Sequence, residues 1–137
     1  MNKERIGNRR IIHAFDAGSP SALAVSGLVS RFHAWRGASG RRYLATVHGA
    51  GEAPAYEGAV IVLARREPDG TRLAVWAGRA PRTPRALARL AQMKRAEEVH
   101  VHLIAERDEE RAAVEADLVT VAAAPLVPEA AGFLAAP

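Results

Sequence analysis

The stretch that decides the fold is AVIVLARREPDGTRLAVWA, residues 59–77. It begins with AVIVLARR at 59–66, a nearly continuous run of aliphatic and β-branched residues that is typical of a strand. The sequence EPDG at 67–70 favours a turn, because proline presets φ and glycine accepts positive φ. Residues 71–77, TRLAVWA, then return as a second strand. The segment is therefore predicted to be a β-hairpin.

A second hairpin is predicted upstream of this one. The segments RFHAWRG at 31–37 and RRYLATVHG at 41–49 flank the short turn ASG at 38–40. Apolar residues alternate along both segments, for example at Tyr43 and Val47, as they do in half-buried strands.

Two helices and one more strand are predicted downstream. Thr83 is a suitable N-cap before Pro84, and Leu87, Leu90 and Ala91 form an apolar stripe at helical spacing. Residues 99–105, VHVHLIA, read as a strand. A second helix is predicted to be capped by Asp108, and its buried stripe comprises Val114, Leu118 and Val121.

These elements predict an α+β fold, with a mostly antiparallel sheet built from two hairpins plus a further strand and two helices packed on it. Residues 31–121 are expected to form this single domain. Residues 1–30 read as an N-terminal basic arm that can include one short strand within residues 1–20 and a short helix over 21–30. Residues 122–137, rich in alanine and proline, are expected to be a flexible tail.

Composition limits the classes of function. The chain has 137 residues and no cysteine, which excludes disulfides, thiolate metal sites and a cysteine nucleophile. No stretch approaches the ~18 consecutive apolar residues of a membrane helix, and no signal peptide is visible, so we expect a cytoplasmic protein without a membrane partner.

Charge is unevenly distributed along the chain. The net charge is +6 over residues 1–48, +5 over 49–96 and −7 over 97–137, and 17 of the 19 basic residues are arginine. Arginine pairs well with phosphate and carboxylate oxygens, so an anionic partner is one interpretation. A GC-rich genome explains the arginine and alanine content equally well.

Residues 58–118 resemble a degenerate GIY-YIG domain, a nuclease module that cuts phosphodiester backbones with a divalent metal. Trp76-Ala77-Gly78 stands where that family's second signature tripeptide closes the hairpin, and helix, strand and helix follow in the family's order. The resemblance implies that Arg85 or Arg82 serves as the arginine of the first helix. It also implies that Glu115 is the metal ligand, for Mg²⁺ or Mn²⁺.

Neither of the family's signature tyrosines is present, because Trp76 replaces the second and the first hairpin strand offers only aliphatic residues. An indole cannot position water or a nucleophile as a phenol does. The resemblance therefore implies a domain that has lost nuclease activity and can retain binding.

The residues themselves also point to an anionic ligand. Arg82, Arg85 and Arg89 share one helical face near a helix N-terminus, and Arg79 precedes them. A solvated outer face is the alternative interpretation. The following residues of the first hairpin are candidates for extending the surface, with the aromatic ring stacking on bases: Arg41, Arg42 and Trp35. The alternative for Trp35 is a structural role in the core or in a cross-strand pair.

His100 and His102 are two apart on a strand, so their rings are predicted to share one face. They could bind a metal if a third ligand, such as His33 or His48, approached, or they could simply cover a polar sheet face.

The leading hypothesis is a nucleic-acid-binding domain of GIY-YIG-like fold without nuclease activity. The first alternative is a protein-interaction or regulatory domain that self-associates as a homodimer, through contact between basic and acidic surfaces. The second alternative is a metal-dependent nuclease that uses Glu115, and only this one requires Mg²⁺ or Mn²⁺ as a cofactor.

Overall fold

The computed structural model describes residues 8–19 and 31–123. The short helix expected over 21–30 and most of the predicted tail lie outside these residues. The strands of the described part are β1 (Asn8–Ile12), β2 (Phe15–Asp16), β3 (Phe32–Arg36), β4 (Arg42–Gly49), β5 (Val60–Arg66), β6 (Arg72–Arg79), β7 (Glu98–His102) and β8 (Val119–Ala123). Its helices are α2 (Pro84–Met93) and α3 (Asp108–Leu118).

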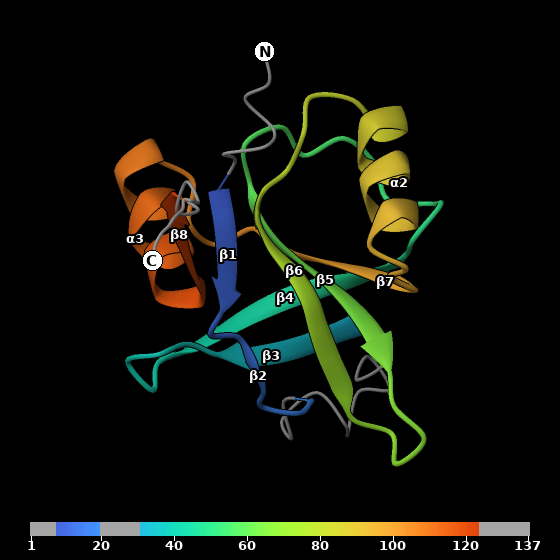
Figure 1. Cartoon of the computed structure of the whole chain (residues 1–137), viewed down its shortest axis with the longest axis horizontal. Helices are drawn as coiled ribbons and strands as arrows, with labels where there is room; N and C mark the ends of the chain where they lie inside the picture. Colours follow the sequence, from blue (N-terminus) through green and yellow to red (C-terminus); the bar gives the residue numbers. More distant parts are fainter. Residues whose placement is uncertain (1–7, 20–30, 124–137) are drawn as a thin grey trace, which may run out of the picture.

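The protein is a mixed α/β fold in which an antiparallel sheet carries one helix on each side (Figure 1). The sheet has six strands in the order β2-β3-β4-β7-β5-β6, and every neighbouring pair is antiparallel. The prediction of two hairpins plus one further strand was too simple. β7 is inserted in the middle, between β4 and β5, and β2 adds an edge strand.

The sheet curves until its two edges meet. The main-chain N–H of Arg72 in β6 donates to the Asp16 carboxylate in β2 across 2.6 Å. This bond links the first strand of the sheet to the last, so the sheet is close to a barrel. Its inner face is therefore screened from water by the sheet itself.

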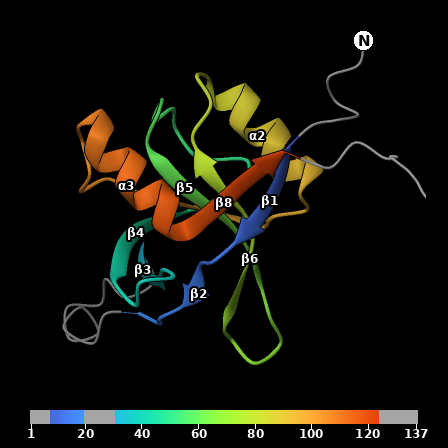
Figure 2. The same cartoon turned by 60° about the vertical axis from the view of Figure 1, so that its left-hand side comes forward.

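Residues 8–16, from the predicted N-terminal arm, contribute both β1 and β2. β1 pairs with β8 as a separate two-stranded sheet, with Ile12 opposite Val119 and Asn8 opposite Ala123 (Figure 2). The prediction that Val121 belongs to the buried stripe of a helix was wrong. α3 ends at Leu118, and Val121 lies in β8 with 43% of its surface exposed. The β-branched run Val119-Thr120-Val121 favours a strand, and β1 supplies its hydrogen-bonding partner.

Two apolar cores lie on opposite faces of the sheet. Val114 and Leu118 of α3 pack with Trp35 and Val62 on the inner face. On the outer face, a second core lies beneath α2 and comprises Ile61, Leu63, Val99, Val101, Leu87 and Ala91. Because both faces are covered, alternate residues of β7 are buried whichever way they point. Within the described residues, no helix is both long and apolar enough to cross a membrane.

Candidate nucleic-acid interface

Helix α2 begins where the sequence predicts. The Thr83 hydroxyl accepts from the main-chain N–H of Ala86 across 3.1 Å, and Pro84 occupies the first turn. The helix ends at Met93 with Lys94 as its C-cap, and Arg95 beyond it adopts a φ of 57°. The cap and the buried side chain of Leu87 together fix which side of the helix faces water.

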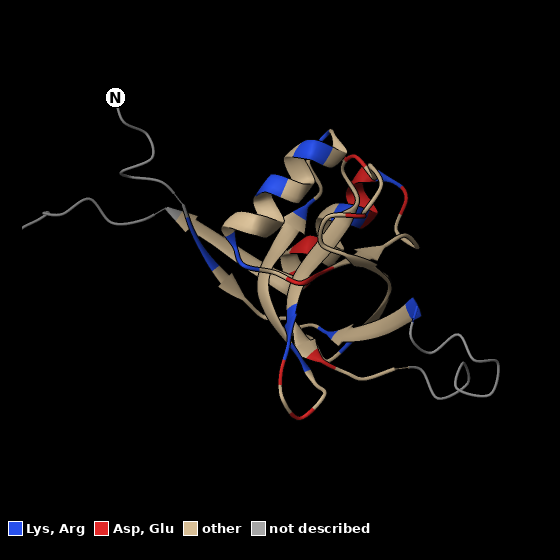
Figure 3. Cartoon of the chain, turned by 90° about the vertical axis from the view of Figure 1, so that its right-hand side faces the viewer, with Lys and Arg blue, Asp and Glu red and all other residues tan. Residues whose placement is uncertain are grey.

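The outer face of α2 is basic. Arg85 and Arg89 lie on the side opposite the buried residues Leu87 and Ala91, and both arginines are exposed. Figure 3 shows basic positions along this helix and no acidic ones. No Asp or Glu occurs in the sequence between Asp69 and Glu97. Neither arginine has a carboxylate within 4.0 Å among residues 8–19 and 31–123. No described residue therefore neutralises their charge.

Arg82 also belongs to this face, but unlike Arg85 and Arg89 it has a carboxylate nearby. Its Nε lies 3.5 Å from Glu57 Oε2, and both side chains are largely exposed. An exposed pair at this distance contributes little, because water screens it and two long side chains lose freedom. Arg82 can therefore exchange Glu57 for another anion. We call Arg82, Arg85 and Arg89 the α2 basic face.

Arg79, grouped with these residues in the sequence prediction, points elsewhere. Its Nη2 lies 3.2 Å from Asp108 Oδ1. Its Nε lies 3.2 Å from Glu115 Oε1, close enough for an ion pair but without hydrogen-bond geometry. Arg79 thus joins β6 to α3 and is neutralised by two carboxylates. The same contact occupies Glu115, whose role as a metal ligand stays a prediction.

Arg41 and Arg42 are exposed, but they lie beside α3, on the other side of the sheet from α2. The structure therefore does not bring them together with Arg85 and Arg89. Trp76 and Glu115 also lie on opposite sides of the sheet. Trp76 belongs to the core under α2, with the Arg10 guanidinium 4.5 Å above its ring, whereas Glu115 lies on α3.

The interpretation of Trp35 as a base-stacking residue was wrong. Its ring is 1% exposed, inside the curved sheet, and Nε1 donates to Nδ1 of His100 across 3.0 Å. A side chain buried in this way cannot reach a base. The alternation of residues 32–36 indicates a strand but not which face is covered.

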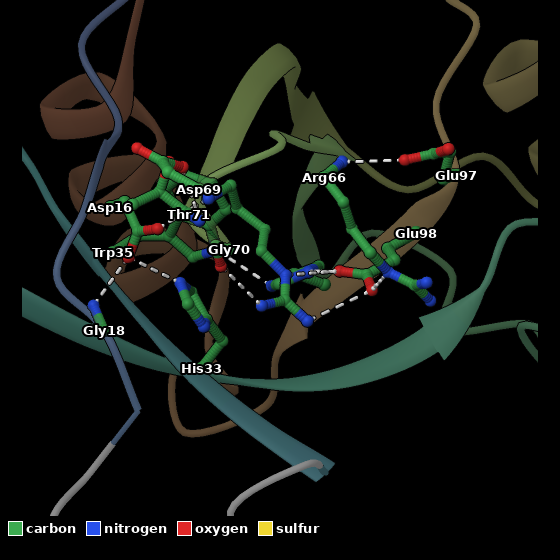
Figure 4. Close-up of polar contacts among 12 residues, drawn as sticks. Asp16, Gly18, His33, Trp35, Arg66, Asp69, Gly70, Thr71, Glu97 and Glu98 are labelled. Carbon is green, nitrogen blue, oxygen red and sulfur yellow. Dashed lines mark hydrogen bonds and ion pairs between the residues drawn. The ribbon is translucent and has the colours of Figure 1, made fainter.

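The largest departure from the sequence analysis is a buried polar network on the inner face (Figure 4). His100 is fully buried, and its Nε2 lies 2.8 Å from Glu98 Oε1. The Glu98 carboxylate also accepts from Nε of Arg66 at 2.7 Å and from Nε of Arg72 at 3.1 Å. A nearby pair, His33 and Asp16, shares a 2.7 Å contact, and the His33 ring lies 5.3 Å from that of His100. The network therefore links five strands.

Hydrogen bonds set the ionisation of this network. The hydrogen bond from His100, followed by those from Arg72 and Arg66, holds the pKa of Glu98 far below its usual range despite burial. Burial lowers the pKa of His100, and Glu98 offsets part of this effect. For Asp16, burial opposes the hydrogen bonds from Arg72 and Gly18, which prevail and lower the pKa. Glu98 is therefore ionised and His100 neutral at pH 7.

His100 and His102 do share one face of β7, as the two-residue spacing predicts, but that face is interior. His33 approaches His100, whereas His48 contacts Thr46 and Tyr56. No set of three or more His, Asp or Glu side chains positioned to hold a metal ion occurs in the part of the chain that the structure describes.

A second polar cluster joins the β3–β4 turn to α3. The Asp117 carboxylate accepts from the hydroxyls of Ser39 at 2.6 Å and Tyr43 at 2.8 Å, and from the Ser39 main-chain N–H at 2.8 Å. A Cβ at Gly37 would lie only 2.3 Å from Asp117 Oδ2, so this close approach requires glycine. Sequence reasoning missed this cluster because Asp117 lies more than 70 residues from its partners in the turn.

Compared with protein-family models, curated proteins and solved structures, the chain has no match.

Proposed function

We propose that this protein binds nucleic acid through the α2 basic face, by contacts to phosphates. The observation that carries the proposal is the pair Arg85 and Arg89, which are exposed on one side of a capped helix with no carboxylate in ion-pair range among the described residues. Guanidinium groups pair with phosphate oxygens in a bidentate manner and lose less hydration than an ammonium group.

Two further features support a polyanion as the ligand. The N-terminus of α2 lies beside Arg82 and Arg85, and its dipole adds to the positive potential there. Lys94 and Arg95, both exposed, continue the positive charge past the other end of the helix. A row of cations along a helix matches the regular spacing of phosphates better than it matches a single small anion.

The proposal is limited to backbone recognition. The described part of α2 presents arginine, alanine, glutamine and methionine outward, and its side chains form no aromatic stacking platform. We therefore expect weak sequence preference and a dissociation constant in the range of about 10⁻⁴–10⁻⁶ M at physiological salt.

The test is a fluorescence anisotropy titration of labelled single-stranded DNA, double-stranded DNA and RNA over a series of salt concentrations. R85E/R89E should lose at least tenfold in affinity. R9E/R31E is the matched control, because it changes net charge equally at two exposed arginines outside the α2 basic face. Equal losses of affinity in both variants would show that binding depends on net charge alone and not on the α2 basic face. Undetectable binding by the parent protein would reject the proposal.

Self-association is the competing outcome of the same experiment. The N-terminal turn of α3 carries Asp108, Glu109 and Glu110, opposite in sign to α2. These carboxylates already contact Arg79 and Arg107 within the chain, which reduces what they offer to a second copy. Light scattering at low and high salt should report a monomer at both. A dimer that dissociates as salt rises would favour the interaction domain instead.

A further inference from the structure

A groove with a volume of about 480 Å³ lies beside α3, on the side of the sheet away from α2. The start of β4 supplies one wall and helix α3 the opposite one, while the end of β7 contributes the floor. The volume falls in the range of about 300–1,000 Å³ that is usual for small-molecule sites. Cationic, hydrogen-bonding and apolar side chains line different parts of the groove, and this arrangement indicates the chemical class of ligand that would fit it.

One rim of the groove is cationic. Arg41 and Arg42 both line it, are exposed, and have no carboxylate within 4.0 Å among the residues described. Arg42 makes only a long 3.4 Å bond to the Ala17 carbonyl. The Asp117 carboxylate accepts from Ser39 and Tyr43 and attracts Arg41 from beyond 4.0 Å. Neither guanidinium group is therefore held in a direct ion pair by the described residues, and both can bind an anion.

The floor holds a buried ring with one free nitrogen. His102 is 7% exposed and lines the groove, and its Nδ1 lies 2.7 Å from the Leu44 carbonyl oxygen. A carbonyl only accepts, so Nδ1 carries the proton and donates. Nε2 has no hydrogen-bond partner in residues 8–19 and 31–123. Nε2 is not among the buried atoms that lack a partner, so it is accessible from the groove, and a hydroxyl or N–H of a ligand can donate to it.

Apolar side chains fill the space between these polar groups. Leu44 and Val114 line the groove, and Ile104 lines it while 70% of its surface remains exposed. Pockets that bind small molecules combine such apolar walls with a few convergent polar groups. The Glu110 carboxylate, on the α3 side, would repel a second negative charge on a ligand.

We propose that this groove binds a small organic acid with one negative charge, an apolar body and a hydrogen-bond donor. The carboxylate pairs with Arg41 and Arg42, the body packs against Leu44, Ile104 and Val114, and the donor meets Nε2 of His102. The site is separate from the α2 basic face, so its test does not depend on nucleic-acid binding.

The experiment is an amide chemical-shift titration of the full chain with three probes of one shape: 4-hydroxyphenylacetate, phenylacetate and 4-hydroxyphenethylammonium. The first should perturb amides of residues 41–44, 102–105 and 110–114. Phenylacetate should bind several-fold more weakly, because it leaves Nε2 unpaired. The cationic probe should not perturb these amides.

Two variants assign the contacts. R41Q/R42Q should weaken the binding of 4-hydroxyphenylacetate at least tenfold. R9Q/R31Q makes the same charge change at exposed sites and should leave this binding unchanged. H102F should lower the affinity for 4-hydroxyphenylacetate to that for phenylacetate, and it should leave the affinity for phenylacetate unchanged.

Should H102F fail to fold, the ¹⁵N shift of Nε2 in the parent protein replaces it, and this shift should move on binding. Equal binding of the cationic probe, no effect of R41Q/R42Q, or no perturbation at millimolar probe would overturn the proposal. Unchanged acid binding in R85E/R89E would show that the two sites are independent.

Discussion

The indole Nε1 of Trp35 donates a 3.0 Å hydrogen bond to Nδ1 of His100 in the interior of the curved sheet. Because an indole N–H can only donate, Nδ1 of His100 must be unprotonated, and the ring proton lies on Nε2. Nε2 then donates to Glu98 across 2.8 Å. One contact between β3 and β7 thereby fixes the tautomer of a buried histidine and orients a carboxylate that two arginines share.

Removing the indole donor should destabilise the fold. W35F leaves Nδ1 of His100 buried without a partner, which costs about 1–3 kcal/mol in addition to the lost ring volume. The matched control is W76F, because the Trp76 indole nitrogen makes no hydrogen bond to the described residues. Urea unfolding monitored by circular dichroism measures both variants. A W35F that is no less stable than W76F would contradict the assigned role of the bond.

Stability should fall as pH decreases through about 6.5. Burial lowers the folded-state pKa of His100 below its ordinary value of 6.5, and burial likewise lowers the pKa of His48. The unfolded chain therefore binds more protons than the folded chain once pH drops below 6.5. Each group can contribute a slope of up to about 1.4 kcal/mol per pH unit in the free energy of unfolding.

Urea titrations at pH 7.5, 6.5 and 5.5 measure this slope, and H48Q isolates the part due to His100. Glu98 should add no loss in this interval, because its pKa lies far below and its contribution disappears only as pH falls below about 4.5. A free energy of unfolding that stays constant or rises between pH 7.5 and 5.5 would show that His100 is not held neutral.

Local signals in the sequence predicted the elements that depend on them. The turn EPDG at 67–70 has Gly70 at a φ of 90°, and the main-chain N–H of Gly70 donates to the Glu67 carbonyl. Thr83 and Pro84 start α2 as expected from capping preferences alone. Such signals act over a few residues, so their interpretation does not depend on the rest of the fold.

Elements that depend on distant partners were missed or predicted without their partners. For residues 1–20 the sequence allows one short strand but does not indicate what it pairs with, and β8 was not predicted at all. β1 and β8 pair residues more than 100 positions apart, so no local signal reveals the pairing. The buried network was missed for a related reason. Glu98, His100 and His102 alternate with Val99 and Val101. This pattern is typical of a strand with one solvent-exposed face, but the curved sheet closes over that face.

The close contact between the β3–β4 turn and α3 gives a steric prediction. G37A places a methyl group against the Asp117 carboxylate and should lower the free energy of unfolding by about 1–3 kcal/mol. G51A is the control, because a Cβ there meets no atom within 4 Å, and it should change stability by less than about 0.5 kcal/mol. Similar thermal midpoints for the two variants would contradict the packing described.

Arg79 and Arg89 should differ in their effect on nucleic-acid binding. Asp108 and Glu115 already neutralise Arg79, whereas Arg89 has no carboxylate in range among the described residues. R89A should reduce the slope of log affinity against log salt by about 1, whereas R79A should leave it unchanged. Anisotropy titrations measure both slopes. A larger effect of R79A would place the phosphates near α3 and β6.

Binding through the α2 basic face is tested most directly by an amide chemical-shift titration with a short single-stranded oligonucleotide. We expect perturbations to concentrate in residues 82–95 and to fade as salt rises, while residues 108–118 of α3 remain unchanged. Perturbations centred on α3 or on the groove beside it, or none at all at low salt, would contradict nucleic-acid binding through the α2 basic face.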